Sequence, residues 1–136
     1  MKSITVTTTV AADREKVWEY WTTSLHIEKW NAASADWECP HAENDLRPKG
    51  IFLFRMSAKD GSVGFDFKGV YTQVIEFEKI AYTIDDGREV TIQFTSTEDG
   101  VRIEETFELE TENGEELQRA GWQAILNRFK QYVEAS

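Results

Sequence analysis

The chain has 136 residues, of which 40% are hydrophobic and 29% charged, and its formal net charge is −10. This length and composition indicate a single globular domain spanning residues 1–136 rather than a disordered chain. With no basic cluster to offset the acidity, a nucleic-acid partner is excluded and an anionic membrane surface is disfavoured.

Residues 3–11 alternate apolar and hydroxyl side chains, which predicts a β-strand and is not the apolar core of a signal peptide. No run approaches the roughly 18 apolar residues of a membrane helix. The only cysteine, Cys39, cannot form an intrachain disulfide, so a reducing compartment fits. These observations together predict a cytoplasmic location.

Asp13 suits the N-cap of a helix that follows the first strand. The apolar stripe of that helix comprises Val17, Trp18, Trp21 and Leu25. A short second helix or turn is predicted to end near Trp30, and the small polar segment 31–37 is predicted to be a loop. Pro40 then indicates an edge strand or a bulge.

From Glu43 onward the apolar period is two, and short turn signals separate the predicted strands. The inward residues of the first two strands are predicted to be Phe52, Phe54 and Met56, then Phe65, Phe67, Gly69 and Tyr71. Further strands cover 80–84, Val90 to Phe94 and Val101 to Leu109. The turns are Asp60-Gly61-Ser62, Asp85-Asp86-Gly87 and Glu98-Asp99-Gly100.

The last segment predicts a helix of about 20 residues, about 30 Å long. Asn113 is its expected N-cap, with Glu116 at the capping-box spacing. Its apolar stripe comprises Trp122, Ile125, Leu126, Phe129, Tyr132 and Val133. The element order predicts an α+β fold. A curved antiparallel sheet of about six to seven strands wraps around this long helix, and two short helices follow the first strand.

Several sequence strings span nearly the whole chain and carry a resemblance to a known superfamily. They are Val17-Trp18-Glu19-Tyr20-Trp21-Thr22, Ala42-Glu43-Asn44-Asp45-Leu46-Arg47, Ala58-Lys59-Asp60-Gly61-Ser62, Gly64-Phe65-Asp66-Phe67 and Gly121-Trp122-Gln123-Ala124-Ile125-Leu126. With the element order, they resemble the helix-grip fold of the START-like (SRPBCC) superfamily, and within it the family named for homology to the activator of the heat-shock chaperone ATPase. The turn Arg47-Pro48-Lys49-Gly50 departs from the more usual glycine pair.

Glu105 is the candidate residue of greatest interest, because alternation places it on the inward face with Ile103 and Phe107. A buried carboxylate must lie near water, be paired, or be protonated with a raised pKa. Such a group could hydrogen-bond a ligand or act as a general acid or base. Two structural alternatives remain open: a register slip or bulge that turns Glu105 outward, or an inward edge position that solvent reaches.

Aromatic residues make up 12% of the chain, and they either line a cavity or simply fill the core. The superfamily resemblance favours a cavity, with Tyr71 and Tyr82 as its polar groups. The predicted ligand-binding residues are Trp30, Trp37, Phe52, Phe54, Phe65, Phe67, Tyr71, Tyr82, Phe94, Glu105 and Trp122.

Gly121 interrupts the last helix, where either the sheet or a ligand is expected to approach closely. Arg47 and Arg55 are interpreted as surface charges, with Asp45 or a ligand anion as the alternative partner. His41, Glu43 and Asp45 share a strand face but match no metal signature. Cys39 and His41 form no recognisable nucleophile–base pair. No cofactor and no metal are therefore predicted.

The leading functional hypothesis is a module that binds a small apolar ligand, more consistent with a binding protein than with an enzyme. The second is an enzyme of the cyclase or hydratase type that acts on a hydrophobic substrate, with Glu105 as its acid or base. The third is a co-chaperone-like interaction domain with a chaperone partner. The family name suggests this role, but in larger relatives it involves a further N-terminal domain. A homodimer is kept as an alternative assembly.

Overall fold

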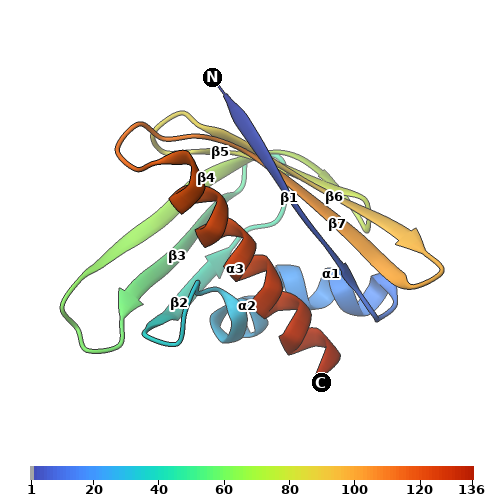
Figure 1. The fold of residues 1–136 in the computed structure, drawn as a ribbon. Coiled ribbons are helices and arrows are strands. Elements are labelled where there is room, and N and C mark those ends of the chain that lie inside the picture. The colour runs from blue at the N-terminus through green and yellow to red at the C-terminus, as the bar shows by residue number, and fades with distance from the viewer. Residues whose placement is uncertain (1) are drawn as a thin grey trace.

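The computed structural model describes residues 2–136, which form seven strands and three helices. In chain order they are β1 (Ser3–Val10), α1 (Arg14–Thr22), α2 (Ser24–Trp30), β2 (Trp37–Asn44), β3 (Ile51–Ala58), β4 (Gly64–Ile75), β5 (Lys79–Ile84), β6 (Glu89–Thr97), β7 (Gly100–Glu108) and α3 (Glu115–Glu134). Figure 1 shows α3 running diagonally beneath the curved sheet. The predicted α+β helix-grip fold is confirmed.

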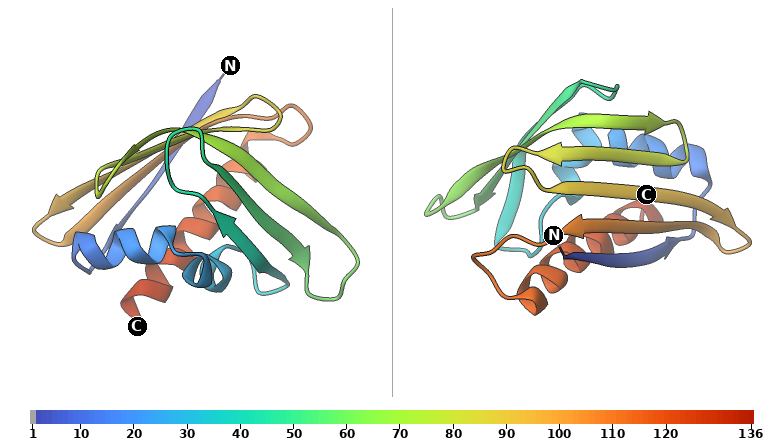
Figure 2. Two further views of the ribbon diagram at one scale, coloured as in Figure 1. Left: turned by 180° about the vertical axis from the view of Figure 1, so that it is seen from behind. Right: turned by 90° about the horizontal axis from the view of Figure 1, so that it is seen from above.

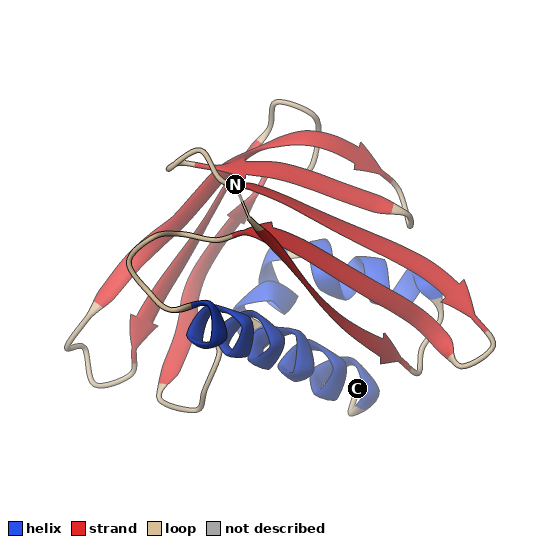
Figure 3. Cartoon of the chain, turned by 45° about the horizontal axis from the view of Figure 1, so that its top comes forward, coloured by secondary structure: helices blue, strands red, loops and turns tan. Residues whose placement is uncertain are grey.

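The strands form one antiparallel sheet in the order β1-β7-β6-β5-β4-β3-β2. From β2 to β7 each strand pairs with its sequence neighbour, because short turns favour antiparallel hairpins. Only β1 is displaced, since α1 and α2 carry the chain from one edge of the sheet to the other. Figure 2, which views the chain from behind and from above, and the cartoon in Figure 3 show all three helices on the concave side of the sheet.

The core lies between the concave face and the C-terminal half of α3. Leu126, Phe129 and Val133 of α3 have no exposed surface, and α3 packs chiefly along β1 while also touching α1 and α2. Trp21 packs edge-on against Phe129 with ring centroids 4.8 Å apart. The C-terminal half of α3 is therefore fixed by close packing.

The start of the first helix follows the prediction, whereas its apolar stripe ends early. The side chain of Asp13 accepts a hydrogen bond of 2.8 Å from the backbone N–H of Lys16, as an N-cap should. The helix stops at Thr22, however, and Thr23 takes an extended conformation. Leu25 consequently belongs to α2 and is 73% exposed, so its predicted place in the stripe was wrong.

The predicted capping box of the last helix was also wrong. Gly114 is the N-cap of α3 and provides no side-chain cap. The Glu116 side chain lies in solvent, 3.8 Å from Arg119. Gln118 instead organises this end of the helix: its side-chain amide donates to the carbonyl oxygens of Glu110 and Asn113, at 3.1 and 2.7 Å.

The turn between β2 and β3 holds one residue in a strained backbone conformation. Lys49 has a φ of 70°, a conformation that L-residues other than glycine rarely adopt. Gly50 has no room for a side chain, because a Cβ there would lie 2.0 Å from the carbonyl oxygen of Asp45. The turn thus requires glycine at position 50 and strains the backbone at Lys49.

The prediction for Pro40 is confirmed, because β2 is an edge strand whose pairing with β3 shifts register between Glu38 and His41. Among residues 2–136, no helix is both long enough and apolar enough to cross a membrane.

Candidate binding cavity

A cavity of about 400 Å³ lies between the concave face of the sheet and the N-terminal half of α3. Its walls come from β2 to β7 and from all three helices, and they are mainly aromatic and aliphatic. The principal apolar side chains are Trp21, Ile27, Trp30, Phe52, Phe54, Met56, Phe67, Ile80, Ile92, Trp122 and Ile125. A small molecule could be enclosed by such walls, since ligand sites are usually apolar clefts of this size.

Gly121 explains why the N-terminal half of α3 leaves space that the C-terminal half fills. It lines the cavity, and a Cβ added there would meet no other atom within 4 Å. The interpretation that the sheet packs closely on this glycine was therefore wrong. A larger side chain at this position would project into the cavity. The absence of a side chain at Gly121 therefore adds to the cavity volume.

Exposed lining residues mark the opening of the cavity. They are Ala33, Phe65, Asn113 and Leu117. Phe65 is 51% and Leu117 66% exposed, although both are large and apolar. The opening thus lies between the N-terminal end of α3 and the loops of the opposite sheet edge, and its rim has an apolar character.

Glu105 lies on the cavity wall and is only 6% exposed. It occupies an inner strand, opposite Val6 of β1 and Ile92 of β6, in a register without shifts. Both structural alternatives raised by the sequence, an outward turn and an edge position, are therefore excluded. The carboxyl group forms no hydrogen bond or ion pair with residues 2–136, and burial raises its pKa from 4.5 to about 8. At neutral pH it is mostly protonated and can both donate and accept a hydrogen bond.

Two tyrosines add hydroxyl groups to the wall. The Tyr71 hydroxyl donates to Oδ1 of Asn44, whose side-chain nitrogen donates to the carbonyl oxygen of Thr22 at 2.7 Å. Burial raises the pKa of Tyr82 well above its usual value, and the nearby charge of Glu105 adds to that rise. The carboxyl group of Glu105 is thus close enough to act electrostatically on the Tyr82 hydroxyl.

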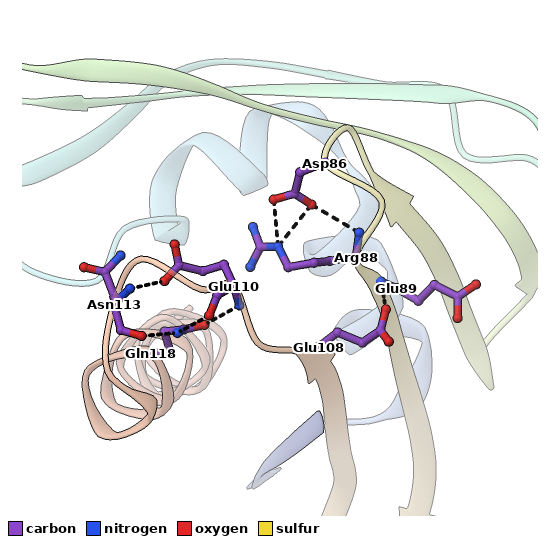
Figure 4. A network of polar contacts seen from close by, with 7 residues as sticks. All are labelled: Asp86, Arg88, Glu89, Glu108, Glu110, Asn113 and Gln118. Carbon is purple, nitrogen blue, oxygen red and sulfur yellow. Dashed lines mark hydrogen bonds and ion pairs between the residues drawn. The ribbon is translucent and has the colours of Figure 1, made fainter. Parts of the chain in front are cut away.

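A cationic group also reaches the cavity, from the turn between β5 and β6. Arg88 lines the wall, and its side chain is only 14% exposed. Its Nε donates to both oxygens of Asp86, at 3.1 and 2.8 Å (Figure 4). Sequence reasoning missed this residue, although alternation with Val90 and Ile92 on the inward face could have identified it.

Nine of the eleven residues predicted to bind a ligand line the cavity. They are Trp30, Phe52, Phe54, Phe65, Phe67, Tyr71, Tyr82, Glu105 and Trp122. Trp37 and Phe94 lie outside it. Trp37 sits on the edge strand and contacts the ring of Phe65, whereas Phe94 lies at the end of β6 that α1 covers, where it packs against Trp18 and Trp21.

The remaining polar candidates lie away from the cavity. Arg47 and Arg55 are exposed surface charges, as interpreted from the sequence. Arg47 pairs with Asp45, and Arg55 pairs with Asp66 at 3.3 Å. The His41 ring bonds Glu43 at 2.8 Å, whereas the Cys39 thiol donates to the backbone carbonyl oxygen of His41 at 3.6 Å and not to its ring. Cys39 is buried, which raises the pKa of its thiol to about 11. Residues 2–136 contain no cluster of three or more His, Cys, Asp or Glu side chains that could hold a metal ion.

Comparison with known proteins places this geometry in context. Residues 11–134 match the profile of the family described as Activator of Hsp90 ATPase homolog 1-like protein. A solution structure of such a protein from Aeromonas hydrophila is 43% identical, with a TM-score of 0.93, covering 98% of this chain and 93% of that one. A solution structure from Cytophaga hutchinsonii is 54% identical, with a TM-score of 0.85, covering 98% and 92%.

A crystal structure from Chromobacterium violaceum, only 23% identical, shares the fold with a TM-score of 0.89 over 98% of this chain and 99% of its own. No functionally curated protein matches the chain.

Proposed function

Because the chain belongs to the Activator of Hsp90 ATPase homolog 1-like family, we propose that it binds a small, mostly apolar molecule between the sheet and α3. The observation that carries the proposal is the aromatic cavity of about 400 Å³ with the unpartnered carboxyl group of Glu105 on its wall. The resemblance to the START-like superfamily favours the same function.

The chemistry of the cavity walls favours an apolar ligand with a polar group. Apolar walls gain about 25 cal/mol for each Å² removed from water. A buried polar group without a partner costs roughly 1–3 kcal/mol, which a ligand oxygen or N–H next to Glu105 would offset. The ligand therefore needs an apolar body with at least one hydrogen-bonding group on it.

The test begins with native mass spectrometry of the protein purified from its own host, followed by extraction and identification of small molecules. A reproducible apolar compound on the wild-type protein supports the proposal. Gly121→Leu is the matched blocking variant, because the new side chain would occupy open cavity volume, and Gly121→Ala is its control. Loss of the compound from the first variant but not the second would assign it to this cavity.

The opposite result has an equally clear meaning. If the purified protein carries no compound, and a panel of lipids and aromatic molecules causes no thermal shift, the binding function is wrong. The favoured hypothesis would then be an interaction with a protein partner such as a chaperone.

The second candidate function is an enzyme, and one observation favours it. Glu105 and Tyr82 are two titratable groups on the same cavity wall, and the charge of Glu105 helps to raise the pKa of Tyr82. An acid with a pKa of about 8 could transfer a proton near neutral pH. A compound identified by extraction should then be converted by the wild-type protein and bound but unchanged by Glu105→Gln. Equal behaviour of the two proteins would contradict catalysis.

A further inference from the structure

Arg88 is the only cationic residue among those that line the cavity within residues 2–136. A guanidinium group carries five N–H donors and no acceptor, and it stays charged at any physiological pH. Nε alone is used internally, by Asp86. The two terminal nitrogens donate no hydrogen bond to residues 2–136, although the side chain is 86% buried. These terminal nitrogens are not themselves enclosed by protein atoms and are accessible where Arg88 lines the cavity, so an acceptor that enters the cavity can pair with them.

Asp86 fixes the direction of the free donors. Its carboxylate holds the Nε edge and also accepts the backbone N–H of Arg88 at 3.1 Å, so the side chain is anchored within its own turn. Figure 4 shows the outer end of the guanidinium pointing away from Asp86, on the side where Glu110 and Asn113 lie. An arginine held along one edge presents its two terminal nitrogens as a fork, which matches the two oxygens of a carboxylate.

The neighbouring acidic groups leave this fork available. Glu110, which also lines the cavity, accepts the backbone N–H of Asn113 at 2.7 Å and forms no ion pair with Arg88. Glu108 accepts the backbone N–H of Glu89 at 2.6 Å. Glu105 lies further along the wall and is mostly neutral at pH 7, so it does not repel an anion strongly.

We propose that the ligand is an apolar carboxylic acid whose carboxylate binds the two terminal nitrogens of Arg88 and whose apolar body fills the aromatic cavity. This inference rests on the proposed binding function and adds the chemical class of the ligand. The carboxylate lies near the loop of Glu110 and Asn113, where the exposed Asn113 and Leu117 mark the opening. The charged end thus stays near water, and the body extends toward Tyr82 and Trp122.

The experiment compares three probes that share one apolar body: naphthoic acid, its methyl ester and naphthylmethylamine. Their affinities are measured by isothermal titration calorimetry for the wild-type protein and for Arg88→Met and Arg88→Lys. The acid should bind wild type about tenfold more tightly than the ester, the usual gain from a charge-assisted hydrogen-bond pair. Arg88→Met should abolish this preference while it keeps the affinity for the ester. Arg88→Lys should retain part of it, because the charge remains and the fork is lost.

The ratio of acid to ester affinity is compared within each protein, so a general loss of stability in a variant cancels. Asp86→Asn is a second variant that keeps Arg88 and loosens its anchor, and it should lower the same ratio. Equal affinities of acid and ester for wild type, or tightest binding of the amine, would overturn the carboxylate inference but leave the apolar binding function intact. If none of the three probes binds wild type, the inference fails together with the function on which it rests.

Discussion

The indole of Trp122 lies flat on the ring of Phe107, with ring centroids 4.3 Å apart and an angle of 7° between the planes. Trp122 follows Gly121 in α3, and Phe107 lies two residues after Glu105 on the same face of β7. This stacked pair therefore holds the N-terminal half of α3 above the sheet next to the cavity.

Replacement of Trp122 should affect stability and binding together. Trp122→Ala should lower the free energy of unfolding by roughly 2–4 kcal/mol, because a large, partly buried aromatic contact is lost. Urea denaturation measures this change. The matched control is Trp37→Leu, which alters an aromatic residue outside the cavity. Any probe that binds wild type should bind the control normally, and weaker binding to the control would argue against this cavity as the site.

Gly121→Ala should stabilise the protein by about 1 kcal/mol, because alanine is the better helix former. Gly121→Leu should stabilise it at least as much, since the side chain enters open volume and covers apolar wall. Thermal melting or urea denaturation compares the two variants with wild type. Destabilisation by leucine would show that the volume beside Gly121 is filled.

Glu105 should make stability fall as the pH rises. Its pKa is about 8 in the folded protein, above the ordinary value of 4.5 that it regains on unfolding. Between these two values only the folded state holds the proton, so the free energy of unfolding should fall by about 1.4 kcal/mol for each pH unit. The stabilisation that the buried Glu105 carboxyl group gives relative to its ionised form is complete below pH 4.5, and it is lost as the pH rises through about 8.

Glu105→Gln is the control for this pH dependence, because it keeps the size of the side chain and cannot ionise. Other groups titrate alike in both proteins, so the difference between their unfolding free energies from about pH 5 to about pH 8 isolates Glu105. Parallel curves would mean that the Glu105 carboxyl group is hydrated or paired rather than buried without a partner.

The strained turn before β3 predicts a simple gain in stability. Lys49→Gly should stabilise the protein by about 0.5–1 kcal/mol, because the relief of left-handed strain exceeds the added entropy of the unfolded chain. Gly50→Ala should instead cost more than about 2 kcal/mol, since its Cβ would collide with the backbone of Asp45. Chemical denaturation of both variants tests the two predictions. A loss of stability in Lys49→Gly would contradict the prediction that the backbone at Lys49 is strained.

The periodicity of the sequence was enough to predict the fold and the inward position of Glu105, because both depend on local alternation and on short turns. It did not reveal that Gly114 rather than Asn113 begins α3. There the side-chain hydrogen bonds of Gln118 to Glu110 and Asn113 outweigh the local capping preference.

The alternation of apolar residues also assigned side chains to the concave face of the sheet. It did not show which part of that face is covered by packed helices and which part lines the cavity. Phe94 and Phe52 both point inward, yet α1 covers the first and the cavity exposes the second to open volume. The crossing direction of α3 over the sheet decides this difference, and it depends on contacts distant in sequence. Arg88 was missed for a related reason, because a charged residue beside a turn ordinarily faces solvent.

The two halves of α3 therefore belong to different regions of local stability. The amide protons of Leu126, Phe129 and Val133 are expected to exchange with solvent only through global unfolding, because these three side chains have no exposed surface. Those near Leu117 to Gly121 border the cavity rather than packed side chains, so smaller openings should expose them. A bound molecule would reduce this difference in amide exchange between the two halves of α3. Slower exchange in the N-terminal half would therefore report that the cavity is occupied, even when the ligand is unidentified.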